Sequence, residues 1–338
     1  MRALVNRDVR PEAVPPPSDE AAVFHLTLPG YRPTPVHRLD RVAVELGLCM
    51  VGLKDESDRL GLPAFKVLGA SWAVERLLAG RPDVHTLVAA SAGNHGRAVA
   101  RVAAMRGLRC RVYLPSRSVE PRRAAIRSEG ADVVIVDGTY EEAVAAAAAD
   151  GATDGVAVVA DVGTSDTARW VIDGYATLFD EARAQGAFDV LLVPIGVGSL
   201  GAAAARFAAT TGAAMIGVEP ATAACLTASL AAGTPASVST PGTTMAGLDC
   251  SEVSAAAWPT LRDGVHGTVT VSDAEVALAV GELTAAGLAI GESGAAPLAA
   301  LRALATDDEC AALRTFVGLG AESRALLVAT EGPTGVPA

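Results

Sequence analysis

The chain has 338 residues, of which 51% are hydrophobic and 19% charged, and its mean hydropathy is +0.35. This composition excludes a chain that is disordered throughout, and the length favours two lobes over a single core. The net charge is −11 and no basic cluster extends beyond Arg122-Arg123, so nucleic-acid binding is not expected.

No apolar run reaches the roughly 18–20 residues that span a bilayer, and residues 1–20 lack the apolar core of a signal peptide. We therefore expect a cytoplasmic protein that has no membrane partner. The five cysteines are far apart, which favours reduced thiols. The five histidines lack the spacing of zinc ligands, so no metal site is expected.

Residues 1–20 are Pro-rich and polar, and we expect them to form a surface arm. Short apolar runs then alternate with helical patterns. The expected strands are 87–91, 110–115, 132–136, 156–161, 190–195, 215–219 and 324–330. The expected helices are 96–105, 121–129, 140–149, 167–184, 200–211, 273–286 and 293–305. Continuous apolar strands alternating with helices predict a doubly wound α/β fold with parallel sheets, whose ligands lie in the loops that follow the strands.

One of these loops is rich in glycine and reads Gly-Val-Gly-Ser-Leu-Gly at 196–201. It fits the pattern G-x-G-x-x-G, and Glu219 ends the next expected strand, as in a dinucleotide-binding fingerprint. Backbone N–H groups at a helix start also bind other phosphates. The loop alone therefore leaves open a nicotinamide cofactor, another phosphate ligand and a plain structural turn.

Lys54 and Lys66 are the two lysines of the chain, and every other basic side chain apart from the histidines is arginine. Lysine can lose its proton and form an imine, which arginine cannot do. Lys66 follows Ala-Phe and precedes an expected helix. The pattern leaves open a reactive lysine and a surface lysine at a helix start.

Several strings in the chain carry a family resemblance. They are Y-R-P-T-P at 31–35, K-D-E-S at 54–57, G-L-P-A-F-K-V-L-G-A-S at 61–71, G-N-H-G-R at 93–97, D-G-Y at 173–175, G-V-G-S-L at 196–200, M-A-G-L-D-C at 245–250, G-E-S-G-A at 291–295 and T-E-G at 330–332. Over roughly residues 25–335 the chain thereby resembles the fold-type II pyridoxal-phosphate enzymes. Among them it is most similar to the diaminopropionate ammonia-lyases, which are related to the threonine and serine dehydratases.

The resemblance implies a tryptophan synthase β-like fold, in which two doubly wound sheets hold the cofactor between two lobes. It implies a large cofactor-binding domain of residues 1–70 and 186–338, a small mobile domain of residues 71–185, and a homodimer. It also assigns the Gly196 loop to pyridoxal 5'-phosphate.

The resemblance further implies a role for each matching residue. Lys66 would hold the cofactor and move the Cα proton. Phe65 would pack near the ring, Asn94 would meet the ring hydroxyl and Thr330 the ring nitrogen. The phosphate would be bound by Gly196, Val197, Gly198, Ser199 and Leu200. The substrate carboxylate would be bound by Ser91 and by the N–H groups from Gly93 to His95.

A second carboxylate is expected from the resemblance at Asp161, with Asp166 as its substitute. An anionic partner suits a substrate with a β-ammonium group. A turn or helix-capping aspartate remains the alternative at Asp161.

The implied reaction is α,β-elimination from a small β-substituted amino acid, with 2,3-diaminopropionate giving pyruvate and ammonia as the leading case. One departure bears on the substrate. The family usually has an aspartate just before Gly-Asn-His-Gly, whereas this chain has Ser91-Ala92, the version of the threonine and serine dehydratases. A dehydratase, a β-replacement synthase, a NAD-dependent oxidoreductase and a catalytically silent cofactor-binding protein remain alternatives.

Overall fold

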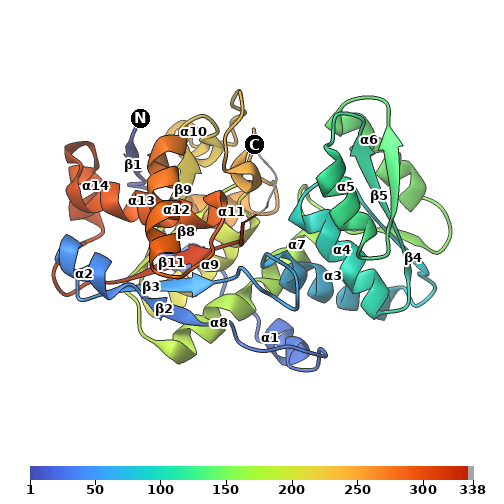
Figure 1. The fold of residues 1–338 in the computed structure, drawn as a ribbon, viewed down its shortest axis with the longest axis horizontal. Helices are drawn as coiled ribbons and strands as arrows, with labels where there is room; N and C mark the ends of the chain where they lie inside the picture. The colour runs from blue at the N-terminus through green and yellow to red at the C-terminus, as the bar shows by residue number, and fades with distance from the viewer. Residues whose placement is uncertain (334–338) are drawn as a thin grey trace. The chain divides into compact units, whose positions relative to one another are not determined.

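Two units, each with its own sheet, make up the chain in the computed structural model, which describes residues 1–333 (Figure 1). The first unit comprises Met1–Ala64 and Ala176–Ala338, and the second comprises Phe65–Tyr175. The units therefore meet after Ala64 and after Tyr175, whereas the boundaries expected from the resemblance fall after residues 70 and 185. The first boundary differs because helix α3 (Lys66–Gly80) packs throughout its length within the second unit.

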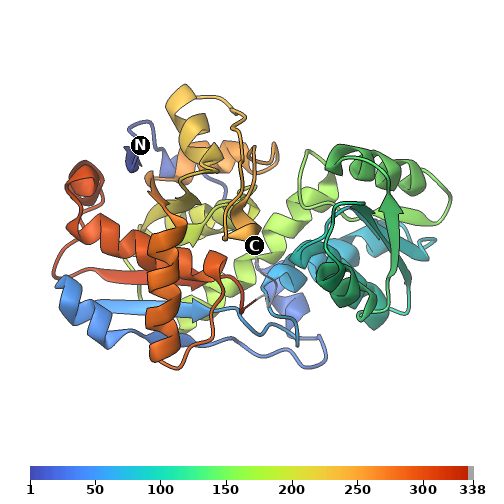
Figure 2. The ribbon, with the colours of Figure 1, turned by 45° about the horizontal axis from the view of Figure 1, so that its top comes forward.

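The sheet of the first unit has seven strands in the order β1-β10-β9-β8-β11-β3-β2. Its five inner strands are parallel, and the edge strands β1 and β2 run antiparallel to their neighbours. Strands β11 and β3 lie side by side although they are far apart in the sequence (Figures 1 and 2). The strands are β1 Ala3–Val5, β2 Val36–Arg38, β3 Met50–Asp55, β8 Val190–Pro194, β9 Ala214–Pro220, β10 Gly267–Val271 and β11 Arg324–Ala329.

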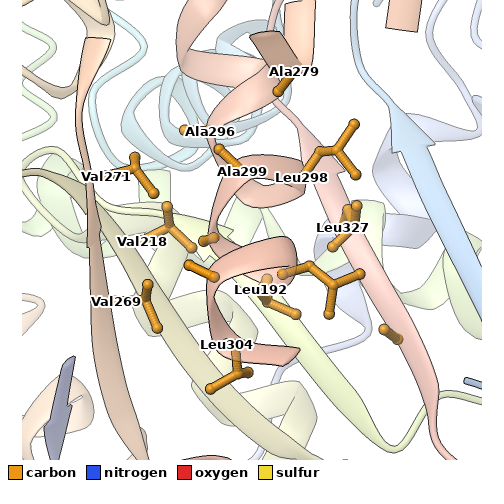
Figure 3. Close-up of a cluster of buried hydrophobic side chains, with 14 of the residues drawn as sticks. Leu192, Val218, Val269, Val271, Ala279, Ala296, Leu298, Ala299, Leu304 and Leu327 are labelled. Atoms are coloured by element: carbon orange, nitrogen blue, oxygen red, sulfur yellow. The ribbon is translucent and has the colours of Figure 1, made fainter. Parts of the chain in front are cut away.

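Helices cover both faces of this sheet, because alternate strand residues point to opposite sides. Val190 and Leu192 face the cluster built on α12 and α13, whereas Met215 lies against Gly201 of α9. Figure 3 shows the buried side chains of α13 packed on the strands. The helices are α1 Glu20–His25, α2 Asp40–Leu46, α8 Ala176–Gln185, α9 Ser199–Thr211, α10 Cys225–Ala232, α11 Trp258–Gly264, α12 Asp273–Ala285, α13 Glu292–Thr306 and α14 Ala311–Phe316, with short 3-10 turns η1 Pro11–Ala13, η2 Ala246–Leu248 and η3 Asp308–Cys310.

The sheet of the second unit has four parallel strands in the order β6-β5-β4-β7. Its strands are β4 Thr86–Ala89, β5 Arg109–Pro115, β6 Asp132–Val136 and β7 Val156–Val158. Its helices are α3 Lys66–Gly80, α4 Asn94–Met105, α5 Glu120–Arg127, α6 Tyr140–Gly151 and α7 Asp166–Gly174. Parallel strands joined through helices in both units confirm the predicted doubly wound α/β fold.

Three predicted elements are wrong in detail. Residues 3–5 are strand β1 rather than part of a surface arm, because their backbone pairs with β10 and Arg2 bonds the carbonyl of Thr270. The expected strand 156–161 ends at Val158, so Asp161 lies in a loop. The expected helix 167–184 is two helices, α7 and α8, separated at Tyr175.

The break at Tyr175 coincides with the boundary between the two units. Gly174 lies so close to α3 that a Cβ atom there would be 2.7 Å from the Leu68 carbonyl oxygen. The helical hydrophobic pattern continues across the break because α7 and α8 each bury one face, and periodicity alone therefore does not reveal it. Among residues 1–333 no helix combines the length and the apolar character that crossing a membrane requires.

Candidate active site

Lys66 is the first residue of α3, where the second unit begins. The loop before it, in the first unit, is fixed by antiparallel bridges from Arg59 to Leu62 and from Ala64 to Glu331. The side chain of Lys66 is largely buried, with 22% of its surface exposed. A lysine at the start of a buried helix has a fixed position, as a covalent attachment site requires.

Asp161 is the charged partner of Lys66. Its Oδ2 atom accepts a hydrogen bond from Lys66 Nζ at 3.0 Å, and it lies 3.8 Å from His95 Nδ1. Burial raises the pKa of the Asp161 carboxyl, but His95, when it is protonated, and the Lys66 ammonium ion lower that pKa by a larger amount, to about 2. The carboxylate is therefore ionised at neutral pH.

Asp166, the other candidate carboxylate, lies elsewhere. It begins α7, its side chain is 69% exposed, and it pairs with Arg169 at 2.8 Å. Of the two predicted aspartates, the structure brings only Asp161 to Lys66.

Two aromatic rings flank Lys66 within the second unit. The ring centroids of Phe65 and Tyr175 are 4.7 Å apart, and Lys66 Nζ lies 5.5 Å from the first and 6.0 Å from the second. Burial raises the pKa of the Tyr175 hydroxyl, so it stays protonated. The sequence placed Tyr175 in a matching string without giving it a role. The sequence feature that relates to this position is Gly69, because its lack of a side chain makes room for the ring: a Cβ atom there would be 2.5 Å from the Tyr175 ring.

The loop that ends in Asn94 and His95 follows β4 and begins α4. Helix α4 starts at Asn94, two residues before the expected start, with Gly93 as the residue that precedes it. Ser91 Oγ accepts a hydrogen bond from the Gly93 N–H at 3.3 Å. The N–H groups at the start of a twelve-residue helix favour an anion there.

The glycine-rich loop belongs to the first unit and joins β8 to α9. Gly198 adopts φ +91°, a left-handed conformation, immediately before α9 begins at Ser199. A Cβ atom on Gly196 would be 2.7 Å from the Gly247 carbonyl oxygen, so the M-A-G-L string packs directly on the loop. Small residues leave the loop N–H groups accessible to a phosphate.

Thr330 follows the last residue of β11, also in the first unit. Its side chain is buried, and among residues 1–333 its Oγ1 atom has no hydrogen-bond partner. A buried hydroxyl without a partner is costly, which suggests that a ligand atom satisfies it. A Cβ atom on Gly294 would be 3.2 Å from the Thr330 nitrogen, so the G-E-S-G-A string packs against the T-E-G string.

These features fit the group that the resemblance implies. A pyridoxal phosphate needs a phosphate-binding loop, a polar partner for its ring nitrogen and a lysine for attachment. In the first unit, the Gly196 loop and the Thr330 hydroxyl suit the phosphate and the ring nitrogen, and in the second unit Lys66 suits the attachment.

Glu219 does not serve as the acidic residue of a dinucleotide site. It is fully buried in β9, and its carboxylate accepts hydrogen bonds from the N–H groups of Leu226 and Thr227 at 2.6 and 2.9 Å. Burial raises its pKa to about 7. The carboxylate supports the start of α10 and is not available to a ribose hydroxyl.

The charged string that begins at Lys54 has a structural role. Lys54 and Arg59 are buried in the first unit and both donate hydrogen bonds to Glu181, at 2.6 and 2.7 Å. Glu56 accepts two further bonds from Arg59. Lys54 is therefore held in a fully buried ion-pair network, whereas the side chain of Lys66, paired with Asp161, is 22% exposed.

Other groups of metal-ligating type are dispersed. Within the described part of the chain, no cluster of three or more His, Cys, Asp or Glu side chains could hold a metal ion. All five cysteines are free thiols.

Comparison with known proteins adds an independent line of evidence. A family model described as pyridoxal-phosphate dependent enzyme matches residues 27–317. The diaminopropionate ammonia-lyase of Salmonella typhimurium is 33% identical over 93% of this chain and 89% of its own. The structure of the Escherichia coli diaminopropionate ammonia-lyase, with an aminoacrylate-PLP azomethine reaction intermediate, superposes with a TM-score of 0.89 at 30% identity, covering 98% of this chain and 94% of that one. An L-threonine dehydratase of Mycobacterium bovis is 34% identical over 61% of this chain and 48% of its own.

Proposed function

Because the chain belongs to the family of pyridoxal-phosphate dependent enzymes, we propose that it eliminates the β-amine of 2,3-diaminopropionate, giving pyruvate and ammonia. The observation that carries this substrate is the ionised Asp161 carboxylate, 3.0 Å from Lys66 Nζ. An anion beside the reactive lysine suits a substrate whose β-substituent is a cation.

Lys66 would attach pyridoxal phosphate, the N–H groups of Gly196 to Leu200 would bind its phosphate, and Thr330 would be the partner of its ring nitrogen. Phe65 would pack beside the ring and Asn94 would meet the ring hydroxyl. When bound, pyridoxal phosphate supplies an electron sink for the pair that the departing Cα proton leaves behind.

Lys66 is the base that takes the proton from Cα, a role for which its nitrogen must be a neutral amine. Asp161 holds the β-ammonium group, so that the nitrogen departs as neutral ammonia and keeps the electron pair of the C–N bond. Ser91 and the N–H groups of Gly93 and His95 hold the substrate carboxylate at the start of α4.

Thr330 favours elimination over transamination. A carboxylate at this position would keep the ring nitrogen protonated and draw negative charge into the ring. A hydroxyl does so more weakly, so that charge stays nearer Cα and expels the β-substituent.

A dehydratase acting on serine or threonine is the second candidate. The observation in its favour is Ala92, which stands where the ammonia-lyases usually have an aspartate. Glu219 argues against the oxidoreductase, because its carboxylate is engaged at α10. The homodimer belongs to this proposal through the resemblance, and the cytoplasmic location through the expectation drawn from the sequence.

The test compares Asp161→Asn with the matched variant Asp166→Asn on three substrates. Keto-acid release is measured from diaminopropionate, serine and β-chloroalanine. We expect Asp161→Asn to lower kcat/KM for diaminopropionate about 10²-fold and to affect β-chloroalanine far less, because chloride needs neither an anionic partner nor a proton. Asp166→Asn should leave all three unchanged, since Asp166 pairs with Arg169 at the surface.

Equal losses on the three substrates would remove Asp161 from the leaving-group role. Serine as the preferred substrate of the unaltered enzyme would favour the dehydratase. No keto acid from any substrate, with cofactor bound, would identify a silent binding protein.

A further inference from the structure

His95 has one ring nitrogen whose proton is fixed by its surroundings. The residue is the second of α4 and is buried, and its Nε2 atom lies 2.8 Å from the Val159 carbonyl oxygen. A carbonyl oxygen only accepts hydrogen bonds, so Nε2 must carry the proton. The state of the ring therefore depends on Nδ1 alone.

The Nδ1 atom faces Asp161. It is buried, it has no hydrogen-bond partner among residues 1–333, and it lies 3.8 Å from Asp161 Oδ2. The same oxygen accepts the hydrogen bond from Lys66 Nζ at 3.0 Å. One carboxylate oxygen thus lies between two basic nitrogens, and the lysine is the nearer.

The Asp161 carboxylate is only 16% exposed, and a positive partner offsets the cost of holding its charge largely out of water. Lys66 provides such a partner as an ammonium ion. When its nitrogen is engaged in covalent attachment or acts as a neutral base, the ammonium ion is lost. His95 Nδ1, 3.8 Å from Asp161 Oδ2, is a basic atom that can then take its place.

We propose that His95 is a positioning residue, whose Nδ1 atom holds the proton that Lys66 gives up and thereby keeps Asp161 charged and in place. The proton passes from Lys66 Nζ to Asp161 Oδ2 and from there to His95 Nδ1. Lys66 becomes a neutral amine, the carboxylate keeps its charge, and the ring becomes an imidazolium ion. This inference rests on the proposed function, in which Lys66 is the base and Asp161 the partner of the β-ammonium group.

The other charged groups near the ring have different partners. Arg97 and Arg101, on the same helix, both pair with Glu129. Tyr175, from the end of α7, is held protonated by burial and lies beyond Lys66. Asp161, and Lys66 through it, are therefore the charged groups to which the role of His95 is assigned.

The direct test is nitrogen NMR of the histidine rings in the full-length chain, with the His95 signal identified by its loss in His95→Asn. At one fixed pH, we expect the ratio of doubly protonated to neutral ring to fall about tenfold or more in Asp161→Asn, because the opposite charge that stabilises the imidazolium ion is gone. The ratio should be higher in the cofactor-loaded chain than in the cofactor-free chain, where Lys66 still holds the oxygen. A ring whose protonation is the same in all three samples would overturn the proposal.

The activity test uses two substitutions that each keep one half of the ring. Asn places an amide near the Nδ1 position and can still face Asp161, whereas Gln places an amide near Nε2 and can still bond the Val159 carbonyl. We expect both substitutions to lower kcat/KM about a hundredfold, because neither amide can hold the proton that Lys66 gives up. Activity retained in His95→Gln would show that the ring merely links α4 to the loop after β7, and activity retained in His95→Asn would show that the position needs a hydrogen-bond donor facing Asp161 rather than a proton acceptor.

The two tests separate this inference from the proposed function. If diaminopropionate is not consumed while the ring still responds to Asp161→Asn, the proposed substrate is wrong and the role of His95 remains. If diaminopropionate is consumed while the ring does not respond, the proposed function remains and the role of His95 is withdrawn.

Discussion

The two lysines of the chain have opposite surroundings, and this contrast defines their chemistry. Lys54 is fully buried and bonds the Thr34 carbonyl and Glu181. Lys66 stands at a helix start beside Asp161 and two aromatic rings, with part of its side chain exposed. Covalent chemistry needs an accessible amine, so only Lys66 can provide it.

Replacing Lys66 by Ala should abolish covalent attachment of the cofactor and lower turnover about 10³-fold or more. The measurement is borohydride reduction followed by mass spectrometry, which should find the cofactor on Lys66 in the unaltered chain. Lys54→Met is the control, since it removes the other lysine and should cost stability while the attachment remains. A reducible link at full stoichiometry in Lys66→Ala would contradict this assignment.

Ala92 bears on stereochemistry. The resemblance implies that the ammonia-lyases act on both enantiomers of diaminopropionate through two bases, a lysine on one face of Cα and the aspartate before Gly-Asn-His-Gly on the other. Ala92 has no group that accepts a proton. We therefore expect the D-enantiomer to react about 10²–10⁴-fold more slowly than the L-enantiomer.

Keto-acid release from the pure enantiomers measures this ratio. Ala92→Asp should raise the rate for the D-enantiomer, whereas Ala92→Asn, of nearly the same shape but without a base, should not. Comparable rates for both enantiomers in the unaltered enzyme would show that Lys66 is not the sole base.

Helix α9 offers a comparison at the scale of one element, because a glycine with positive φ stands at each end. Gly198, at φ +91°, precedes the helix, and Gly212, at φ +74°, follows it. A Cβ atom added at Gly198 would lie 2.5 Å from the Leu261 side chain, whereas a Cβ atom added at Gly212 would have no atom within 4 Å. Only the Gly198 end belongs to the proposed phosphate loop.

Gly212→Ala should destabilise the fold by about 1–2 kcal/mol, the cost of a left-handed alanine, and Gly198→Ala should cost more, because its Cβ atom also displaces the Leu261 side chain. Only Gly198→Ala should also weaken cofactor binding, by about tenfold or more, since it moves the N–H groups that face the phosphate. Thermal unfolding and titration with pyridoxal phosphate separate the two effects. An equal loss of cofactor affinity in both variants would argue against the phosphate role of this loop.

The same scale shows what the sequence reveals and what it does not. Inner strands such as β8 and β9 are predictable because strands buried on both faces are apolar throughout. The three-residue edge strand β1 is not, because its pairing depends on backbone bonds to β10. The break between α7 and α8 cannot be predicted from local sequence, because its cause is the contact of Gly174 with α3, which is far away in sequence.

Individual site residues divide in the same way. Local strings single out Lys66 and the Gly196 loop as candidates, and the resemblance assigns their roles. The local sequence does not distinguish Asp161 from Asp166, because their positions depend on where β7 ends and on the course of the loop that follows it. The proposed role of His95 as a positioning residue depends on its distance from Asp161, which lies in that loop.

At the scale of the whole molecule, the first unit is assembled from two stretches that the second unit separates in sequence. The buried ion-pair network joins them: Lys54 and Arg59 come from the first stretch, and Glu181 of α8 from the second. Tyr31 adds a hydrogen bond to Glu181 at 2.6 Å. Glu181 therefore connects the two parts of this unit.

Glu181 also predicts how the unit responds to acid. Burial raises the pKa of its carboxyl, but hydrogen bonds and charge from Arg59 and Lys54 lower it from an ordinary value of 4.5 to about 2. A lowered pKa in the folded state adds stability that is complete above the unfolded value and lost as the pH falls through the folded value. The shift corresponds to about 3 kcal/mol, which should disappear between about pH 4.5 and pH 2.

Glu181→Gln should remove this contribution and leave Lys54 and Arg59 with Glu56 as their remaining anionic partner. We expect a loss of about 3–5 kcal/mol at pH 7, because one partner of a buried ion network is gone. The difference from the unaltered chain should narrow as the pH falls toward 2, where Glu181 is protonated in both states. Urea unfolding at several pH values measures this difference in the free energy of unfolding. The control is Glu252→Gln, which changes an exposed residue. A difference that stays constant from pH 7 to pH 3 would show that Glu181 contributes through packing rather than through its charge.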